Sequence, residues 1–240
     1  MDKFRIEVIA ATPNPQQVIW GAMHQDYSED FVLDSQEKWP DEKKAGELII
    51  KHLLSANRGH WGPTEHPQIT FNVGYFPHSM MQQVRTHRVG ISFDVQSFRY
   101  TGKRIVDVAL GTKDVENVFY LRPVGDYTNR QGKRYFYSQE QRNEDIEWCL
   151  KACQHYQKRI NEGLSEEHAR GLIPFDARQH FVLSCNLRSL LHLLDLRWKK
   201  DAQLEAQKFC ELLYVHLEAW TPAVARWYLE NRAKKARLAP

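Results

Sequence analysis

The stretch from Gln82 to Tyr100 constrains the fold more than any other part of the sequence. It reads QQVRTHRVGISFDVQSFRY, so three arginines and a histidine alternate with apolar residues over nineteen positions. Because the apolar side chains must be buried, the charged ones cannot all face water, and a partly buried arginine requires a partner. A phosphate group matches the planar donors of a guanidinium. The stretch therefore predicts an anion-binding segment.

The first half of this stretch has the spacing of a helix. If HSMMQQVRTHR is helical, Gln82, Arg85 and Thr86 lie on one face, and Arg88 lies one turn beyond Arg85. This arrangement predicts a fork of guanidinium donors on one side of the helix.

The second half, after Gly90, is expected to be extended or loop chain. Period-two geometry then points Ser97 and Arg99 in the same direction, where both reach one ligand. The alternative interpretation of the whole stretch is a solvated basic helix end followed by a polar loop.

The size and charge of the chain favour a protein that binds small anions. The 240 residues are enough for one domain, residues 1–240, with a sizeable core. The net charge is only +3 and the pI is near 8.6, which is too weak a basic field for a protein held to duplex DNA by phosphate contacts. We therefore expect small anionic ligands and no nucleic-acid partner.

No targeting or membrane segment is evident in the sequence. The start lacks a small-residue cleavage pattern, and no apolar run reaches the length that spans a bilayer. These features predict a cytoplasmic protein without a membrane partner.

Neither the cysteines nor the histidines have metal-ligand spacing. The four cysteines lie in segments with helical periodicity and form no CxxC pair, so we expect reduced, buried thiols: Cys149, Cys153, Cys185 and Cys210. His52, His60 and His66 lack HExxH spacing. We expect no metal site.

The coarse pattern alternates strands with helices. Strands are expected for FRIEVIAATP, 68–75, 104–110 and 118–121, and helices for 13–27, 41–56, 139–162, a helix from 165 that contains Arg170, and the C-terminal segment to about 235. This order predicts an α+β fold, a central and mostly antiparallel sheet packed with long helices in a single domain.

An aromatic and basic run, YTNRQGKRYFY, lies between the two halves of the chain. Such a run can stack on single-stranded nucleic acid. We favour the solvated face of a hairpin because the net charge of the chain is so small.

A second polar pattern lies in CNLRSLLHLLDLRWKKDAQLEAQ. As a helix, this segment has a leucine stripe and an adjacent polar face with Arg188, His192 and Asp195. At 100° per residue, Arg197 has nearly the same direction around the helix as Asn186 and Leu190, near the apolar stripe, and lies about 16 Å along the axis from Asn186. Its guanidinium should therefore be paired or should project into a polar pocket.

Several ordered motifs between His60 and Gln207 resemble those of the flavin-dependent thymidylate synthases. The segment RTHRVGISFDVQSFRY is similar to the family's RHR motif followed by Ser, one residue and Arg, although Thr86 is inserted and the run before Ser97 is one residue longer. Asp94 and Val95 stand where the family usually has an Asn-Glu pair. The other matches are GHWGPTEH, ARGLIP and NLRSLLHLLDLR.

The resemblance implies roles for individual residues. Flavin contacts are implied for His60, Gly62, Arg85, His87, Arg88, Asn186, Arg188 and His192, the last in place of a more usual Asn. Nucleotide contacts are implied for Gln82, Arg85, Ser97, Arg99, Arg170 and Arg197, and Arg197 is also the residue implied to activate the pyrimidine.

The activity implied by the resemblance is the reductive methylation of dUMP to dTMP. The cofactor would be FAD, with methylenetetrahydrofolate as carbon donor and NADPH as reductant, in active sites shared among the subunits of a homotetramer. No GxGxxG loop follows a strand, so a Rossmann-type dinucleotide site is not expected. The alternative is a non-catalytic protein that binds a nucleotide or single-stranded RNA with the same arginines.

Overall fold

The computed structural model describes residues 3–55, 60–129 and 131–235, and the chain forms two compact units. The α6 unit, named after its long helix α6 (Gln139–Asn161), contains Lys3, Gly74–Gln83 and Val95–Phe181. The α8 unit, named after helix α8 (Leu187–Arg197), contains Phe4–Val73, Val84–Asp94 and the described residues from Val182 onward.

A four-stranded sheet has the order β1-β2-β6-β3. Its strands are β1 (Arg5–Ala11), β2 (Gln68–Pro77), β6 (Arg178–Asn186) and β3 (Ile91–Val95). The backbone hydrogen bonds Leu187 N to Pro67 O and His78 N to Ala177 O pair β2 with β6 in opposite directions. The bonds Asn186 N to Gly90 O and Gln96 N to His180 O do the same for β6 and β3. The predicted antiparallel sheet and α+β fold are confirmed.

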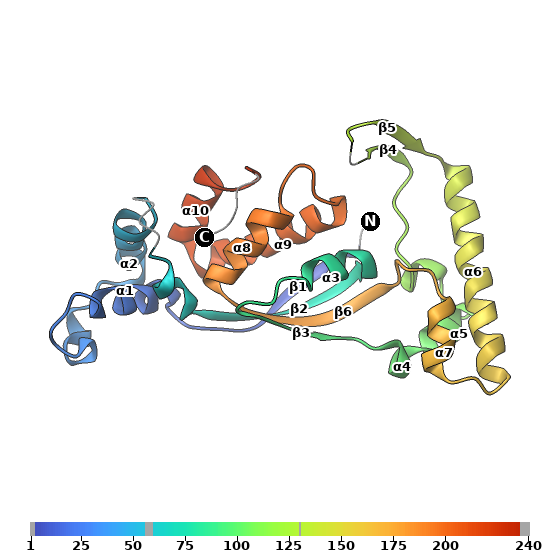
Figure 1. The fold of residues 1–240 in the computed structure, drawn as a ribbon, viewed down its shortest axis with the longest axis horizontal. Coiled ribbons are helices and arrows are strands. Elements are labelled where there is room, and N and C mark those ends of the chain that lie inside the picture. The colour runs from blue at the N-terminus through green and yellow to red at the C-terminus, as the bar shows by residue number, and fades with distance from the viewer. Residues whose placement is uncertain (1–2, 56–59, 130, 236–240) are drawn as a thin grey trace. The chain divides into compact units, whose positions relative to one another are not determined.

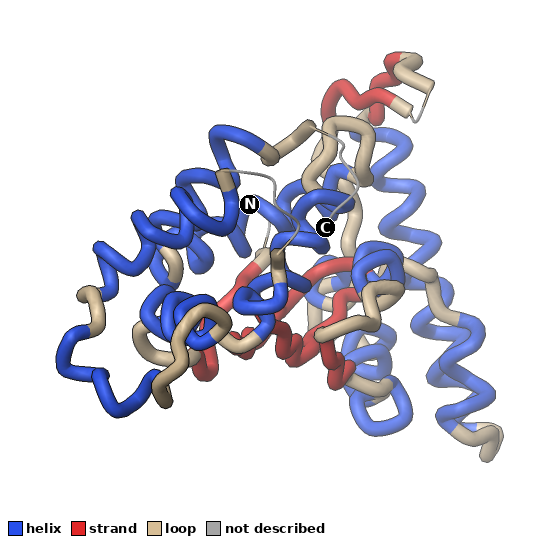
Figure 2. The backbone as a smooth tube through the Cα atoms, turned by 60° about the vertical axis from the view of Figure 1, so that its left-hand side comes forward, coloured by secondary structure: helices blue, strands red, loops and turns tan. Residues whose placement is uncertain are grey.

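In the α8 unit, α8 (Leu187–Arg197) and α9 (Leu204–Trp220) lie over one face of the sheet (Figures 1 and 2). The other helices of this unit are α1 (Pro15–Gln25), α2 (Glu42–Ile49) and α10 (Pro222–Asn231), with short helical segments at Val32–Lys38, Ile50–Leu54 and Gly62–Glu65. α9 packs on β1 and β2: His216 Nε2 lies 2.9 Å from Ile6 O, and the His216 ring lies 5.8 Å from that of Phe71.

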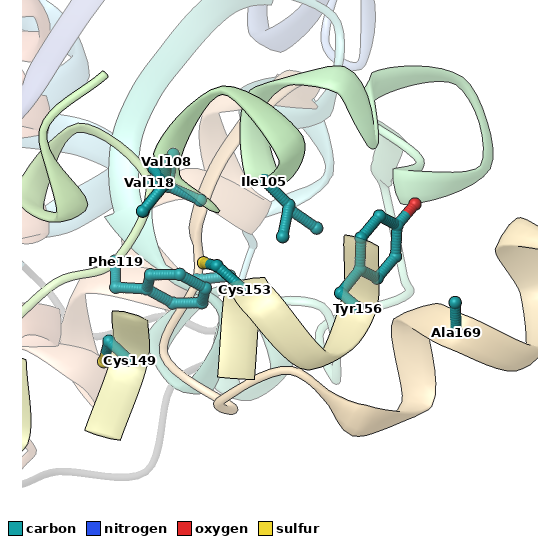
Figure 3. Close-up of a cluster of buried hydrophobic side chains, with 9 residues drawn as sticks. Ile105, Val108, Val118, Phe119, Cys149, Cys153, Tyr156 and Ala169 are labelled. Carbon is teal, nitrogen blue, oxygen red and sulfur yellow. The ribbon is translucent and has the colours of Figure 1, made fainter. Parts of the chain in front are cut away.

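Four helices of the α6 unit share a hydrophobic core: α4 (Phe98–Thr101), α5 (Lys103–Ala109), α6 (Gln139–Asn161) and α7 (Glu166–Ala169). The unit also contains most of α3 (His78–Val84) and single turns at Val115–Asn117 and Arg170–Leu172. Figure 3 shows Ile105 of α5 pointing toward Cys153 and Tyr156 of α6. All three side chains are at most 1% exposed. Burial of this apolar face stabilises the pair of helices.

Polar side chains define where several helices begin. Asp41 accepts a hydrogen bond from the backbone of Lys44 and thereby caps α2. Ser138 and Gln141 form a reciprocal capping box at the start of α6. The helix predicted for 41–56 therefore begins at Glu42 and continues from Ile49 into the helical segment Ile50–Leu54, while position 56 lies outside the described residues. The helix predicted for 139–162 spans Gln139–Asn161.

The aromatic and basic run forms a solvated hairpin, as predicted. Strand β4 (Gly125–Thr128) pairs antiparallel with β5 (Arg134–Tyr137). Tyr135 and Phe136 are exposed, and the Arg122 guanidinium lies 5.3 Å from the Tyr127 ring.

Outside the stretch from Gln82 to Tyr100, three predictions of secondary structure are wrong. The segment 104–110 lies almost wholly in helix α5, because Ile105 and Val108 face α6 three residues apart. The segment 118–121 forms only an isolated bridge between Phe119 and Ala177. Cys185 lies in strand β6, which the sequence did not indicate.

The remaining expected elements are found, with two differences. The C-terminal helix is divided into α9 and α10 at Thr221, because proline at position 222 begins a new helix. Arg170 follows the end of α7 and begins a single helical turn. No helix in the described ranges is long and apolar enough to cross a membrane.

Candidate functional site

The segment from Arg85 to Gly90 lies along helix α8 in the α8 unit. Ser189 Oγ donates a hydrogen bond to Val89 O over 2.8 Å near the start of the helix. At the other end, Arg197 Nη2 donates to Thr86 Oγ1 over 2.9 Å. The two contacts are separated by eight helical residues, or about 12 Å along the axis. The segment thus runs antiparallel to the helix.

Gly90 is required for this close approach. Its φ of +66° lies in the left-handed region, which favours glycine. A Cβ placed there would lie 2.3 Å from Ser189 Oγ and 2.5 Å from Asn186 Nδ2. Any other side chain would therefore push the segment away from the start of α8.

The Arg197 side chain is paired, as its position near the apolar stripe predicted. Its Nε donates to His87 Nε2 over 3.0 Å, in addition to the bond to Thr86. Nη1 makes no hydrogen bond to any residue that the structure describes. Two nitrogens therefore orient the guanidinium and one is left to meet a ligand.

His87 is a neutral acceptor in this arrangement. Only 7% of the residue is exposed. Burial, followed by the charges of Arg197 and His192, lowers the pKa of His87 to about 4. The imidazole is neutral near pH 7, and because Nε2 accepts from Arg197, Nδ1 carries the proton. The ring of His192 lies edge-on to it, with 5.4 Å between centroids.

Asn186 caps the helix α8, and Arg188 connects two of the motifs found in the sequence. Asn186 Oδ1 accepts from Ser189 N over 2.8 Å and caps α8. Arg188 Nη1 forms an ion pair with Glu65 Oε1 at 2.5 Å. The start of α8 is thus joined to the GHWGPTEH segment.

His60 and Gly62 lie in the same unit. His60 Nε2 lies 2.7 Å from Asp26 Oδ2, and both side chains are about half exposed. A Cβ at Gly62 would meet no atom of the described residues within 4 Å, so these residues leave open space beside the Gly62 backbone.

Arg85 and Arg88 are exposed and follow the end of α3 at Val84. The prediction that Gln82, Arg85 and Thr86 share a helical face is wrong, because only Gln82 is helical. Neither Arg85 nor Arg88 has a hydrogen-bond or ion-pair partner among the described residues.

In the α6 unit, Gln82 extends from α3 and contacts its helical neighbour. Gln82 Nε2 lies 2.8 Å from His78 Nε2. The His78 ring packs edge-on against that of Phe175, with 5.1 Å between centroids. His78 therefore holds the exposed amide of Gln82.

Ser97, Arg99 and Arg170 also belong to the α6 unit. Ser97 is the N-cap of α4, so the predicted period-two alternation of Ser97 and Arg99 is wrong. Arg99 Nε pairs with Glu167 Oε1 at 2.9 Å. Arg170 is exposed, three residues after Glu167.

Sequence reasoning missed three residues that bind the predicted ones. Thr86 looked like an insertion but receives a hydrogen bond from Arg197. Glu65 and Glu167 pair with Arg188 and Arg99, over 123 residues in the first case. The position of Glu65 in the GHWGPTEH motif was the only local signal.

The four cysteines are free and buried, which agrees with the prediction. Burial raises the pKa of the Cys149 thiol to about 11 and that of Cys153 to about 12. The pKa values of Cys185 and Cys210 are also raised by burial. These thiols are therefore protonated and poor nucleophiles near pH 7.

Comparisons with known proteins agree on one family. A protein-family model described as "Thymidylate synthase complementing protein" matches residues 7–223. The flavin-dependent thymidylate synthase of Haloarcula marismortui (strain ATCC 43049 / DSM 3752 / JCM 8966 / VKM B-1809) is 33% identical over 254 residues, covering 98% of this chain and 99% of the relative. That of Halobacterium salinarum (strain ATCC 700922 / JCM 11081 / NRC-1) is 31% identical, covering 98% and 100%.

Solved structures show the same fold. The UMP/dUMP methylase PolB from Streptomyces cacaoi, bound with 5-Br dUMP, has a TM-score of 0.77 and 20% identity, covering 100% of this chain and 98% of PolB. Thymidylate synthase X (ThyX) from Helicobacter pylori, with FAD and dUMP, has a TM-score of 0.71 and 19% identity, covering 97% and 99%.

Proposed function

Because this chain belongs to the flavin-dependent thymidylate synthase family, we propose that it methylates dUMP at C5 to form dTMP, with FAD as its cofactor. Methylenetetrahydrofolate is the proposed carbon donor and NADPH the proposed reductant. The transfer of a methylene group and its reduction to a methyl group require two electrons from this reductant. A cytoplasmic location and a single domain over residues 1–240 belong to the same proposal.

The orientation of Arg197 is the observation that carries the proposal. His87 and Thr86 accept from two of its nitrogens and leave Nη1 for a ligand. A guanidinium held in this way does not have to reorient when negative charge develops on a bound pyrimidine, so the free-energy cost of reorganisation is small. We assign Arg197 to the stabilisation of that charge.

The residues of the α8 unit fit FAD by the chemistry of their donors. FAD presents a pyrophosphate and ring carbonyl oxygens, which accept hydrogen bonds from cationic and amide groups. Arg85 and Arg88 are exposed cations, and Asn186 uses Oδ1 for the cap of α8, which leaves its amide nitrogen as a donor. The open space at Gly62 allows a ligand to approach the backbone there.

We propose that these residues hold the cofactor, together with His60, His87, Arg188 and His192. Bound FAD would supply the reducing equivalents. Arg188 would remain fixed by Glu65, so that its direction is set before the cofactor arrives.

We propose that the nucleotide is bound by arginines and by polar side chains, namely Gln82, Arg85, Ser97, Arg99, Arg170 and Arg197. Planar guanidinium donors suit the phosphate, while amide and hydroxyl groups suit the base and sugar. Binding by these groups would orient the pyrimidine for attack.

We also propose a homotetramer with shared active sites, because the residues assigned to the nucleotide need not come from one subunit. Light scattering should report four times the mass of the 28.3 kDa chain. A monomer with full activity at every concentration would refute this assembly.

The function is tested by product formation. Purified protein loaded with FAD should be yellow, should bleach with NADPH, and should form dTMP when dUMP and methylenetetrahydrofolate are added. Omission of each component in turn, and replacement of dUMP by UMP, define the requirements. A folded, flavin-loaded protein that forms no dTMP would overturn the proposal, and a colourless protein that binds only RNA would support the alternative.

A further inference from the structure

Arg99 forms an ion pair with the side chain of Glu167. Its Nε lies 2.9 Å from Glu167 Oε1, and the two side chains are 48% and 56% exposed. A carboxylate at this position uses a guanidinium donor that a phosphate oxygen would also use. Nucleotide phosphate and Glu167 therefore compete for Arg99, if Arg99 binds the nucleotide as proposed above.

The neighbours of this ion pair show what a phosphate would gain. Ser97 Oγ accepts from Arg99 N over 3.3 Å, so the hydroxyl hydrogen is available to an acceptor. Arg170 is exposed and has no ion-pair partner among the described residues. Of these two arginines, only Arg99 is paired with a carboxylate among the described residues.

We propose that Glu167 is an internal competitor for the nucleotide phosphate and sets the affinity of the enzyme for dUMP. This inference rests on the proposed function. A phosphate dianion has more charge and more acceptor oxygens than a carboxylate, so it displaces Glu167 from Arg99. The displaced carboxylate loses its partner and repels the phosphate, which weakens dUMP binding. A ligand without a phosphate does not have to displace it.

The proposal makes dUMP affinity depend on the charge of Glu167. An ion pair between half-exposed side chains is weak, so the Glu167→Gln variant should bind dUMP about two- to fivefold more tightly than the wild-type holoenzyme at low ionic strength. Inorganic phosphate should compete with dUMP more strongly in the variant. The affinity for deoxyuridine, which lacks the phosphate, should be unchanged.

Glu166→Gln is the matched control. It removes the same charge one residue away, and Glu166 forms no ion pair with any described residue. If competition for Arg99 is the cause, Glu166→Gln should change the dUMP dissociation constant less than Glu167→Gln. Calorimetric titration of each holoenzyme with dUMP, deoxyuridine and phosphate measures these differences.

Three results would overturn the inference: unchanged or weaker dUMP binding by Glu167→Gln, an equal effect of Glu166→Gln, or an equal change for deoxyuridine. The first would show that Glu167 holds Arg99 in place for the ligand or is irrelevant to it. Failure of the proposed function is distinguishable, because the wild-type holoenzyme itself would then fail to bind dUMP.

Discussion

Arg197 Nε donates a hydrogen bond to Nε2 of His87 over 3.0 Å, although the two residues are 110 positions apart. Neither partner is placed there by local structure alone. His87 follows helix α3 by three residues, and Arg197 is the last residue of α8. Their pairing connects the two arginine-containing motifs of the sequence within the α8 unit.

Arg197→Lys tests the role assigned to this pair. Lysine retains the charge but loses the planar fork that His87 and Thr86 orient. We expect FAD content to be retained and dTMP formation to fall by about 10²–10³-fold, the effect of losing one well-aimed donor. Oxidation of NADPH should be affected much less, because that half-reaction places no charge on the pyrimidine. Near-normal dTMP formation by the folded variant would make Arg197 a structural residue.

The low pKa of His87 predicts a dependence of stability on pH. The folded-state value of about 4 lies below the ordinary value of 6.5. Between these values the unfolded chain binds a proton that the folded chain does not, so the free energy of unfolding should decrease as pH falls from about 6.5 to about 4. Above pH 6.5 and below pH 4 this group should contribute no slope.

The control for His87 is His87→Gln, whose amide oxygen can accept from Arg197 but does not titrate. Urea unfolding of both proteins at pH 7, 5.5 and 4.5 isolates the contribution of the imidazole. The stability of the wild type relative to the variant should decrease toward pH 4.5. A constant difference would show that His87 titrates normally.

Gly90→Ala should damage the segment that lies along α8. The new Cβ meets Ser189 and Asn186 and also strains a left-handed backbone, so we expect a loss of about 2–4 kcal/mol in unfolding free energy. Gly111→Ala is a matched control, since its φ is +73° but no atom lies within 4 Å of the added Cβ. That variant should lose only about 1 kcal/mol. Equal losses in thermal or urea unfolding would exclude the steric explanation.

Cys185→Ala tests whether the enzyme uses a protein thiol. Burial raises the pKa of Cys185, and only 1% of the residue is exposed. We expect turnover and flavin content to be retained, with a stability loss of about 1 kcal/mol from the smaller side chain. Complete loss of dTMP formation in a folded, flavin-loaded variant would identify a nucleophile.

Local sequence pattern was sufficient for elements with a clear period. The apolar spacing of 41–56 indicated a helix that the structure contains, and the helix expected for 139–162 is also found. Pattern failed for 104–110, where β-branched residues favour a strand in isolation. Packing of Ile105 and Val108 on α6 outweighs that preference, which amounts to less than about 1 kcal/mol per residue.

The sequence by itself determined which residues could bind an anion and that Arg197 needed a polar partner, because charge and helical period are local properties. It did not determine the partners. His87, Thr86, Glu65 and Glu167 meet their arginines only through strand pairing and helix packing over long separations, and these depend on the burial of the whole apolar surface. Tertiary structure therefore decided which arginines are held by a partner and which, such as Arg85 and Arg88, have none within the described chain.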